Sequence, residues 1–390
     1  MKIALVADRV GPLAESGTAD VVAAPLAAAL AERGHLVTLY ACELALDAPP
    51  GVDVVRLRGA CTQPADDPLA LLPESGGLLA RRWSADPPDI IHAMSWTAGL
   101  TVLAALRDTT TAAGEPAAIP LVQTFDRPAR HDLAHDGGRA RLEAAIARSA
   151  VAIVARSAGE VAELTRLGVP RSAVTMIPCG VDLERFTPDG PVAARTERQR
   201  VVAVGPLNER YGADLAVRAL RRIPRAELVI VGGPAPQDLA AHPVARRLLD
   251  EVARCRVGDR VRLTGAVPDA ELPGLLRSAD VAVRSTTYEQ CGAQVLAAMA
   301  CGVPVLATEV GALADIVAEG ATGDLVPPRQ PEAFTTALHG LLGDPTKLAG
   351  YRIGAADRAR ARYGWDRIAA DTEAAYARTL SPARAVAEVG

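Results

Sequence analysis

Two runs of alternating short apolar segments and helical segments constrain the fold of this chain most strongly. The apolar segments predict buried strands at residues 3–7, 35–40, 52–57, 89–93, 120–125, 150–155 and 173–177, and then at 200–204, 226–231, 261–263, 280–284 and 304–307. Residues 189–199, rich in Pro, Gly, Ala and Arg, separate the two runs and predict a linker. Strands that alternate with helices favour parallel sheets. We therefore expect an α/β protein with two doubly wound, Rossmann-like domains that face a cleft, one at residues 1–188 and one at 196–365.

The composition narrows the class of protein. The chain has 390 residues, of which 49% are hydrophobic and 23% charged, as in globular proteins. A net charge of −4 argues against a nucleic-acid partner or a polybasic membrane patch. No apolar run approaches the ~18 residues of a stable membrane span, and no signal-peptide cleavage site follows the start. We expect a cytoplasmic protein, and no sequence feature specifies its oligomeric state.

Cysteine and lysine usage limits the chemistry. The six cysteines show neither a CxxC pair nor a zinc-like spacing with histidine, so we expect no metal site. They are Cys42, Cys61, Cys179, Cys255, Cys291 and Cys301, and we expect them to be reduced, small buried side chains in the cytosol. The only lysines are Lys2 and Lys347, so an arginine, a helix end or a metal ion must neutralise any bound phosphate. This scarcity counts against a Schiff-base cofactor such as pyridoxal phosphate.

One strand–loop–helix segment has the features of a phosphate site. The predicted strand at 280–284 is followed by a polar loop, by Gly292 and by a helix predicted at 293–301. The unpaired N–H groups of a first helical turn attract anions, and glycine allows the backbone to come close. On geometry alone, one more βα unit of a parallel sheet is the safer interpretation of this segment.

The stretch 288–302, YEQCGAQVLAAMACG, resembles the donor-site signature of retaining two-domain glycosyltransferases (GT-B, family 4-like). This family includes the sucrose-phosphate synthases and the mycothiol glycosyltransferases, and its usual form is E-P-F-G-x-x-x-x-E followed by A-x-A-C-G. The matching residues are Glu289, Gly292, Ala298, Cys301 and Gly302. Gln290 and Cys291 depart from the pattern, and Ala297 stands at the second glutamate.

Two other segments support the resemblance. Residues 178–186, PCGVDLERF, are close to the P-x-G-V-D-x-x-x-F pattern with which this family crosses between domains. The tail resembles the family's final helix, which implies that a helix over 366–380 completes the first domain.

The resemblance implies a donor site in the second domain. The family loop G-R-L-x-x-x-K-G supplies an arginine and a lysine to the donor diphosphate, but here Pro206 and Tyr211 replace them. Arg210 is the nearest substitute, and it is either a phosphate ligand or a solvated loop residue. Glu289 matches the glutamate that reaches the donor sugar. The implied donor-binding set is Gly205, Arg210, Val267, Glu289, Gln290, Cys291, Gly292, Ala293 and Ala297, with Val267 near the base.

The implied acceptor-side residues are Gly17, Thr18, Trp96, Asp126 and Arg127. Thr18 is predicted to cap a helix that begins near Ala19. Trp96 follows a strand at its carboxyl end, where it could form an acceptor platform or pack in the core. Asp126 stands where the family has histidine, and it either caps a turn or orients an acceptor hydroxyl, with a possible role as base.

These residues lead us to expect a metal-independent glycosyltransferase that moves a sugar from a nucleoside diphosphate-sugar to a small-molecule acceptor with retention, using Glu289, Arg210 and Asp126. No separate cofactor is expected. The alternatives are a non-catalytic pseudo-enzyme, because Asp126, Pro206, Tyr211 and Ala297 all replace expected polar groups, and a variant that uses a thiol or amine acceptor.

Overall fold

The computed structural model describes residues 1–11, 13, 21–45, 47–57, 72–125 and 137–381, and the chain divides into two compact α/β units. The first unit comprises Met1–Gly11, Thr18–Pro178 and Trp365–Gly390, and the second comprises Pro12–Gly17 and Cys179–Gly364, in so far as these residues are described. Within the described stretch 137–381, the chain passes from the first unit to the second at Pro178–Cys179 and returns at Gly364–Trp365. The predicted linker at 189–199 lies inside the second unit.

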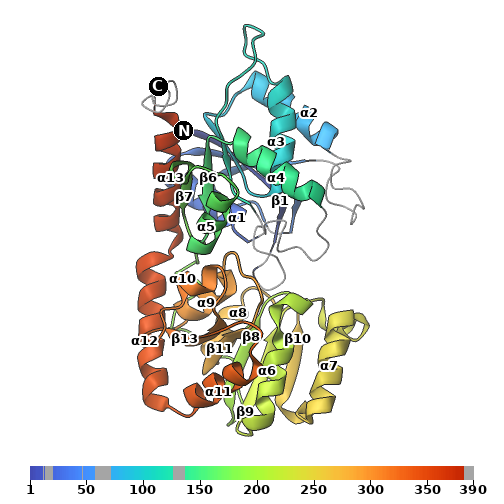
Figure 1. Ribbon diagram of the computed structural model, residues 1–390, viewed down its shortest axis with the longest axis vertical. Coiled ribbons are helices and arrows are strands. Elements are labelled where there is room, and N and C mark those ends of the chain that lie inside the picture. The colour runs from blue at the N-terminus through green and yellow to red at the C-terminus, as the bar shows by residue number, and fades with distance from the viewer. Residues whose placement is uncertain (12, 14–20, 46, 58–71, 126–136, 382–390) are drawn as a thin grey trace. The chain divides into compact units, whose positions relative to one another are not determined.

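In its described residues the first unit contains a seven-stranded parallel sheet (Figure 1). Its strands are β1 (Lys2–Val10), β2 (Leu36–Leu44), β3 (Val52–Arg56), β4 (Ile90–Ala93), β5 (Leu121–Gln123), β6 (Ala152–Ala155) and β7 (Val174–Met176), in the order β3-β2-β1-β4-β5-β6-β7. Its helices are α1 (Ala23–Glu32), α2 (Leu72–Ala85), α3 (Trp96–Asp108), α4 (Gly137–Ser149), α5 (Ala158–Arg166) and α13 (Trp365–Leu380). The sheet order reverses between β1 and β4, as in doubly wound folds.

The described part of the second unit repeats this plan with six parallel strands. They are β8 (Gln199–Val204), β9 (Ala226–Val231), β10 (Val261–Gly265), β11 (Val281–Arg284), β12 (Val305–Thr308) and β13 (Gly323–Val326), in the order β10-β9-β8-β11-β12-β13. The helices are α6 (Ala213–Ala219), α7 (Pro243–Cys255), α8 (Leu272–Arg277), α9 (Ala293–Ala300), α10 (Ala312–Ile316), α11 (Pro331–Leu342) and α12 (Pro345–Arg362). The two doubly wound sheets confirm the predicted fold class.

The start of α1 corrects one prediction. The helix begins at Ala23 rather than near Ala19, and its N-cap is Val22, which makes no side-chain capping hydrogen bond. The predicted cap, Thr18, lies outside the described residues. Pro25 gives the reason for the later start: it has no N–H and sits in the first turn, where none is needed, whereas a helix from Ala19 would place it in the interior at a cost of ~3 kcal/mol.

In the second unit the sheet order reverses between β8 and β11, which pair directly in parallel register. Right-handed crossovers then send the helices on either side of this point to opposite faces of the sheet. The loops after β8 and β11 consequently lead to helices on opposite faces, and the carboxyl edge at such a reversal is where open α/β sheets bind ligands. This reversal positions the candidate site described next.

Candidate donor site

The two loops at the carboxyl ends of β8 and β11 are joined by hydrogen bonds. Arg284, the last residue of β11, donates from Nη1 to the carbonyl oxygen of Val204 at 3.0 Å. Two further bonds follow along the loops. Ser285 Oγ donates to the carbonyl of Gly212 at 2.7 Å, and the Thr287 N–H donates to the carbonyl of Arg210 at 3.3 Å. The loop at 205–212 is therefore held against the segment that leads to α9.

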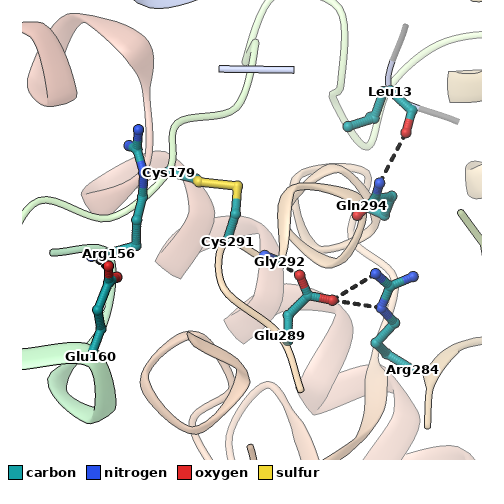
Figure 2. The surroundings of a disulfide bond; sticks show 9 residues. All are labelled: Leu13, Arg156, Glu160, Cys179, Arg284, Glu289, Cys291, Gly292 and Gln294. Atoms are coloured by element: carbon teal, nitrogen blue, oxygen red, sulfur yellow. Dashed lines mark hydrogen bonds and ion pairs between the residues drawn. A yellow bond between two sulfur atoms is a disulfide. The ribbon is translucent and has the colours of Figure 1, made fainter. Parts of the chain in front are cut away.

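Glu289 is the most constrained side chain in this region. It is only 3% exposed, and its Oε2 accepts a hydrogen bond from Arg284 Nε at 2.8 Å (Figure 2). Its Oε1 accepts from the N–H of Gly292 at 3.2 Å, and its carbonyl oxygen accepts from the N–H of Ala312 at 2.9 Å. The predicted sugar-contacting carboxylate is thus already paired inside the protein.

Gly292 begins α9, close to where the sequence predicts this helix. Gly292 is the N-cap, with a left-handed φ of 68°, and a Cβ there would lie 2.5 Å from Cδ1 of Ile316. Only glycine combines this conformation with this packing. In the first turn of α9, Gln294 Nε2 donates to the carbonyl of Leu13 at 2.9 Å, so Leu13 contacts the start of this helix (Figure 2).

Cys291 corrects the prediction that the cysteines are reduced. It forms a disulfide bond with Cys179, and the two Cα atoms are 5.4 Å apart (Figure 2). Each of these residues is 1% exposed. The bond joins the segment that enters the second unit to the residue that precedes Gly292. The 112-residue separation hides this pairing in the sequence, since only the folded sheet brings both loops to one edge. Cys255 and Cys301 are free thiols, and Cys61 lies outside the described residues.

Tyr211 occupies the place of the family lysine and packs against two arginines. Its ring centroid is 3.8 Å from Cζ of Arg284 and 5.9 Å from Cζ of Arg210. A cavity of about 550 Å³ lies beside this loop, lined among others by Gly205, Tyr211 and Arg284 from the loops and by residues of α6 and α7. Arg284 is therefore the residue that both lines the cavity and binds Glu289.

The residues expected near the base and ribose occupy other parts of the second unit. Val267 is half-buried after β10, in a loop tied to the one after β9 because the Ala266 N–H donates to the Pro234 carbonyl at 2.9 Å. Ala297, in α9, exposes none of its surface. Gln290, Cys291 and Ala293 are also buried.

On the acceptor side, Gly17, Thr18, Asp126 and Arg127 lie outside the described residues. Trp96 is the first residue of α3 and is half-buried, with Cζ of Arg139 4.9 Å from its ring centroid. Trp96 belongs to the first unit, whereas the candidate donor residues from Gly205 to Ala297 are all in the second.

Sequence reasoning missed two groups of buried polar residues. Arg284 was treated as the end of an apolar run, although an arginine that closes a buried strand is itself a signal. In the first unit, His92 forms hydrogen bonds through Nδ1 with the Tyr376 hydroxyl at 2.7 Å and through Nε2 with Thr124 Oγ1 at 2.8 Å. Burial and the nearby Arg156 charge lower the pKa of His92 to about 3, so it is neutral at physiological pH.

Two features are absent from the described residues. In that part of the chain, no cluster of three or more His, Cys, Asp or Glu side chains could hold a metal ion. None of its helices is long and apolar enough to span a membrane.

Known glycosyltransferases resemble this chain in both of its halves. Residues 198–344 match the family "Glycosyl transferases group 1", and residues 19–185 match "Glycosyltransferase Family 4". The D-inositol 3-phosphate glycosyltransferase 2 of Catenulispora acidiphila is 31% identical over 99% of this chain and 96% of its own length. The D-inositol 3-phosphate glycosyltransferase of Kineococcus radiotolerans is 32% identical over 97% and 95%.

Two solved structures extend the comparison. The sucrose-phosphate synthase of Thermosynechococcus elongatus superposes with a TM-score of 0.83 at 26% identity, covering 97% of this chain and 98% of that one. Anabaena HepE, solved in complex with UDP and glucose, has a TM-score of 0.75 at 19% identity, covering 98% of this chain and 100% of that one, and shares the fold.

Proposed function

This chain belongs to the group 1 glycosyltransferases, and from that premise we propose that it transfers a sugar from a nucleoside diphosphate-sugar to a small hydroxyl acceptor with retention. The observation that carries the proposal is the position of Glu289 and Gly292 at the sheet reversal, beside the loop after β8. In the family these elements hold the donor sugar and its diphosphate. The nucleoside diphosphate-sugar is a substrate, and no separate cofactor is part of the proposal.

The main catalytic task is to stabilise the diphosphate as it leaves. The first N–H groups of α9 point to the carboxyl edge of the sheet, where they bind negative charge without reorganising. Glu289 orients the sugar through its hydroxyl groups, and the loop after β10, with Val267, lies on the base side. In the first unit, Trp96 and Asp126 remain the residues proposed to bind the acceptor.

The relatives suggest the first acceptor to test. Two of them are named D-inositol 3-phosphate glycosyltransferases, so we propose a phosphorylated polyol of that kind as the acceptor. A cytoplasmic location and a metal-independent reaction remain parts of the proposal.

The test is product formation by the purified full chain. UDP-, GDP-, ADP- and dTDP-sugars are each incubated with D-inositol 3-phosphate, with a plain polyol, and with a thiol and an amine, and products are identified by mass spectrometry. We expect one donor and the phosphorylated polyol to give product, and NMR of that product to show the donor's own anomeric configuration. Inversion would refute the stereochemical part, and a thiol or amine product would refute the acceptor class. Donor binding without any product would support a non-catalytic role instead.

A further inference from the structure

The candidate diphosphate site has lost the family's two cations but has gained a different one. Pro206 and Tyr211 replace the arginine and lysine of the loop after β8. Lys347 is engaged elsewhere, since its Nζ lies 2.8 Å from Oδ2 of Asp324 on β13. Arg284, at the end of β11, places its guanidinium against the start of the same loop, where Nη1 donates to the carbonyl of Val204.

The loop is built around this guanidinium. A Cβ on residue 205 would lie 2.6 Å from Arg284 Nη1, so Gly205 leaves the space that the guanidinium fills. Tyr211 covers its face, with the ring centroid 3.8 Å from Cζ. The side chain is 4% exposed, and an arginine so deeply buried requires an anion.

Glu289 provides that anion in this structure, and it uses the donors that a phosphate group would use. Its carboxylate lies against the Arg284 fork and accepts from the Gly292 N–H, so a guanidinium and a helix N-terminus share one anion. The match is incomplete, because Arg284 Nη2 lies 2.6 Å from Oε2 yet has no hydrogen-bond partner among the described residues. A larger anion with more oxygens would satisfy this donor as well.

We propose that Arg284 is the arginine that binds the donor diphosphate, and that the Glu289 carboxylate occupies this anion site until the donor displaces it. The exchange keeps the buried guanidinium paired throughout. It also frees Glu289 to reach the hydroxyl groups of the sugar. This inference rests on the proposed function, because it assumes that the donor is a nucleoside diphosphate-sugar.

The test compares four variants of the full chain by calorimetric titration with UDP, GDP, ADP and dTDP, and then with the matching nucleoside. The variants are Glu289→Gln, Arg284→Met, the double variant Arg284→Met/Glu289→Gln, and Arg210→Gln as the control cation. The double variant leaves no unpaired buried charge, so it remains informative if Arg284→Met alone does not fold.

We expect the double variant to bind the diphosphate about 10- to 100-fold more weakly, which corresponds to the loss of charged hydrogen bonds, and to bind the nucleoside as before. Glu289→Gln should bind the diphosphate more tightly than the wild type, because the competing carboxylate is gone. It should also melt at a lower temperature without ligand and regain the wild-type melting temperature with it. Arg210→Gln should have the smaller effect.

Wild-type diphosphate affinity in the double variant, or weaker diphosphate binding in Glu289→Gln, would overturn the inference alone. Equal weakening for nucleoside and diphosphate in the double variant would do the same, since it would indicate a purely structural role. If the wild type binds none of the four diphosphates, the proposed function fails and the inference fails with it.

Discussion

Two buried arginine–glutamate pairs, one in each unit, begin from the same local sequence and end in different arrangements. In the first unit β6 is followed by Arg156 and Ser157, and in the second β11 ends with Arg284 and is followed by Ser285. Both arginines are 4% exposed and both glutamates, Glu160 and Glu289, are 3% exposed. The difference lies in the loop between the serine and the helix that follows.

In the first unit the helix begins at once. Ser157 is the N-cap of α5 and accepts from the Glu160 N–H at 3.1 Å, while Glu160 Oε2 accepts from the Arg156 N–H at 2.7 Å. Ser157 thus caps α5, while Glu160 reaches back to the N–H of the residue before the cap, which is a variant of the capping box. The carboxylate is thereby committed to the backbone, and Oε1 is buried without a hydrogen-bond partner in the described part of the chain. Burial consequently raises the pKa of Glu160 to about 7 and lowers that of Arg156 to about 10.

In the second unit, α9 begins only at Ala293. The longer loop lets Glu289 turn back to the Arg284 side chain rather than to its backbone, and the two charges meet directly. The comparison shows that the position of the glutamate relative to the helix start decides the outcome. A glutamate in the first turn caps the backbone, and a glutamate in the loop binds the guanidinium.

The largest expected effect comes from breaking the direct pair. Arg284→Met should leave the Glu289 carboxylate buried without its partner and lower the free energy of unfolding by about 3–5 kcal/mol. Urea denaturation of the full chain measures this loss. Arg222→Met removes an arginine from the exposed pair with Glu332 and should cost less than about 1 kcal/mol. Equal losses in the two variants would contradict the assignment.

A third buried glutamate, introduced by substitution without an arginine partner, extends the comparison of the two native pairs. Ala297 exposes no surface, so Ala297→Glu should place a carboxylate where it lacks a partner and destabilise the protein by about 3 kcal/mol. Ala300→Glu, in the last turn of the same helix, is the matched burial control, because it lies away from the helix start. If Ala297→Glu alone keeps its stability and binds a nucleoside diphosphate more tightly than the deoxyribose analogue, the ribose site of the family is open here as well.

The next largest expected effect comes from removing the disulfide bond, which ties down the loop that carries Glu289 of the second pair. In the described part of the chain, a disulfide bond ties the loop that carries Glu289 and not the one that carries Glu160, so Cys179→Ala/Cys291→Ala should lower the free energy of unfolding by about 2–4 kcal/mol. A phosphine reductant should weaken the wild type to the same extent and leave this variant unchanged. Cys255→Ala/Cys301→Ala removes two buried thiols without removing a cross-link, and it should remain sensitive to the reductant. A wild type that is indifferent to reduction would contradict the prediction.

The sequence predicts regular structure well where apolar patterns and caps are local. The strands at 226–231 and 280–284 and the helix from Ala293 follow from runs of apolar residues and a glycine. Strand β13 (Gly323–Val326) was not predicted, because it is four residues long and contains Asp324. The capping signal at Thr18 predicts a start for α1 near Ala19, whereas Pro25 is compatible with the observed start at Ala23 because proline is tolerated in the first turn.

The sequence predicts the site only where the residues of the site belong to one short motif. Glu289 and Gly292 are three residues apart and can be recognised together. The bond between Cys179 and Cys291 and the contact between Arg284 and Tyr211 join segments that are distant in sequence, and they exist only after the sheet has formed. A charged residue at the end of an apolar run carries no indication of the partner that it will meet.

The smallest expected effect is the pH dependence of stability that arises from the first pair, Arg156 and Glu160. A carboxyl pKa raised from 4.5 to about 7 means that the folded protein holds a proton that the unfolded chain has released. The stability from Glu160 is therefore fully present below about pH 4.5 and is lost as the pH rises through 7. His92, at the carboxyl end of β4, has the opposite sign. Its pKa is lowered from 6.5 to about 3, so its contribution is present above pH 6.5 and is lost as the pH falls.

Between about pH 5 and 6.5 these two contributions oppose each other at about 1.4 kcal/mol per pH unit each, and in the wild type they nearly cancel. Single variants should separate them. Relative to the wild type, Glu160→Gln should lose about 2 kcal/mol of unfolding free energy on acidification across this window, and His92→Gln should gain about as much. Urea denaturation at a series of pH values measures the three slopes. If Glu160→Gln and His92→Gln change the pH slope of the unfolding free energy in the same direction, the buried cluster around Arg156 does not titrate as described. The two arginine–glutamate pairs would then differ in geometry but not in protonation.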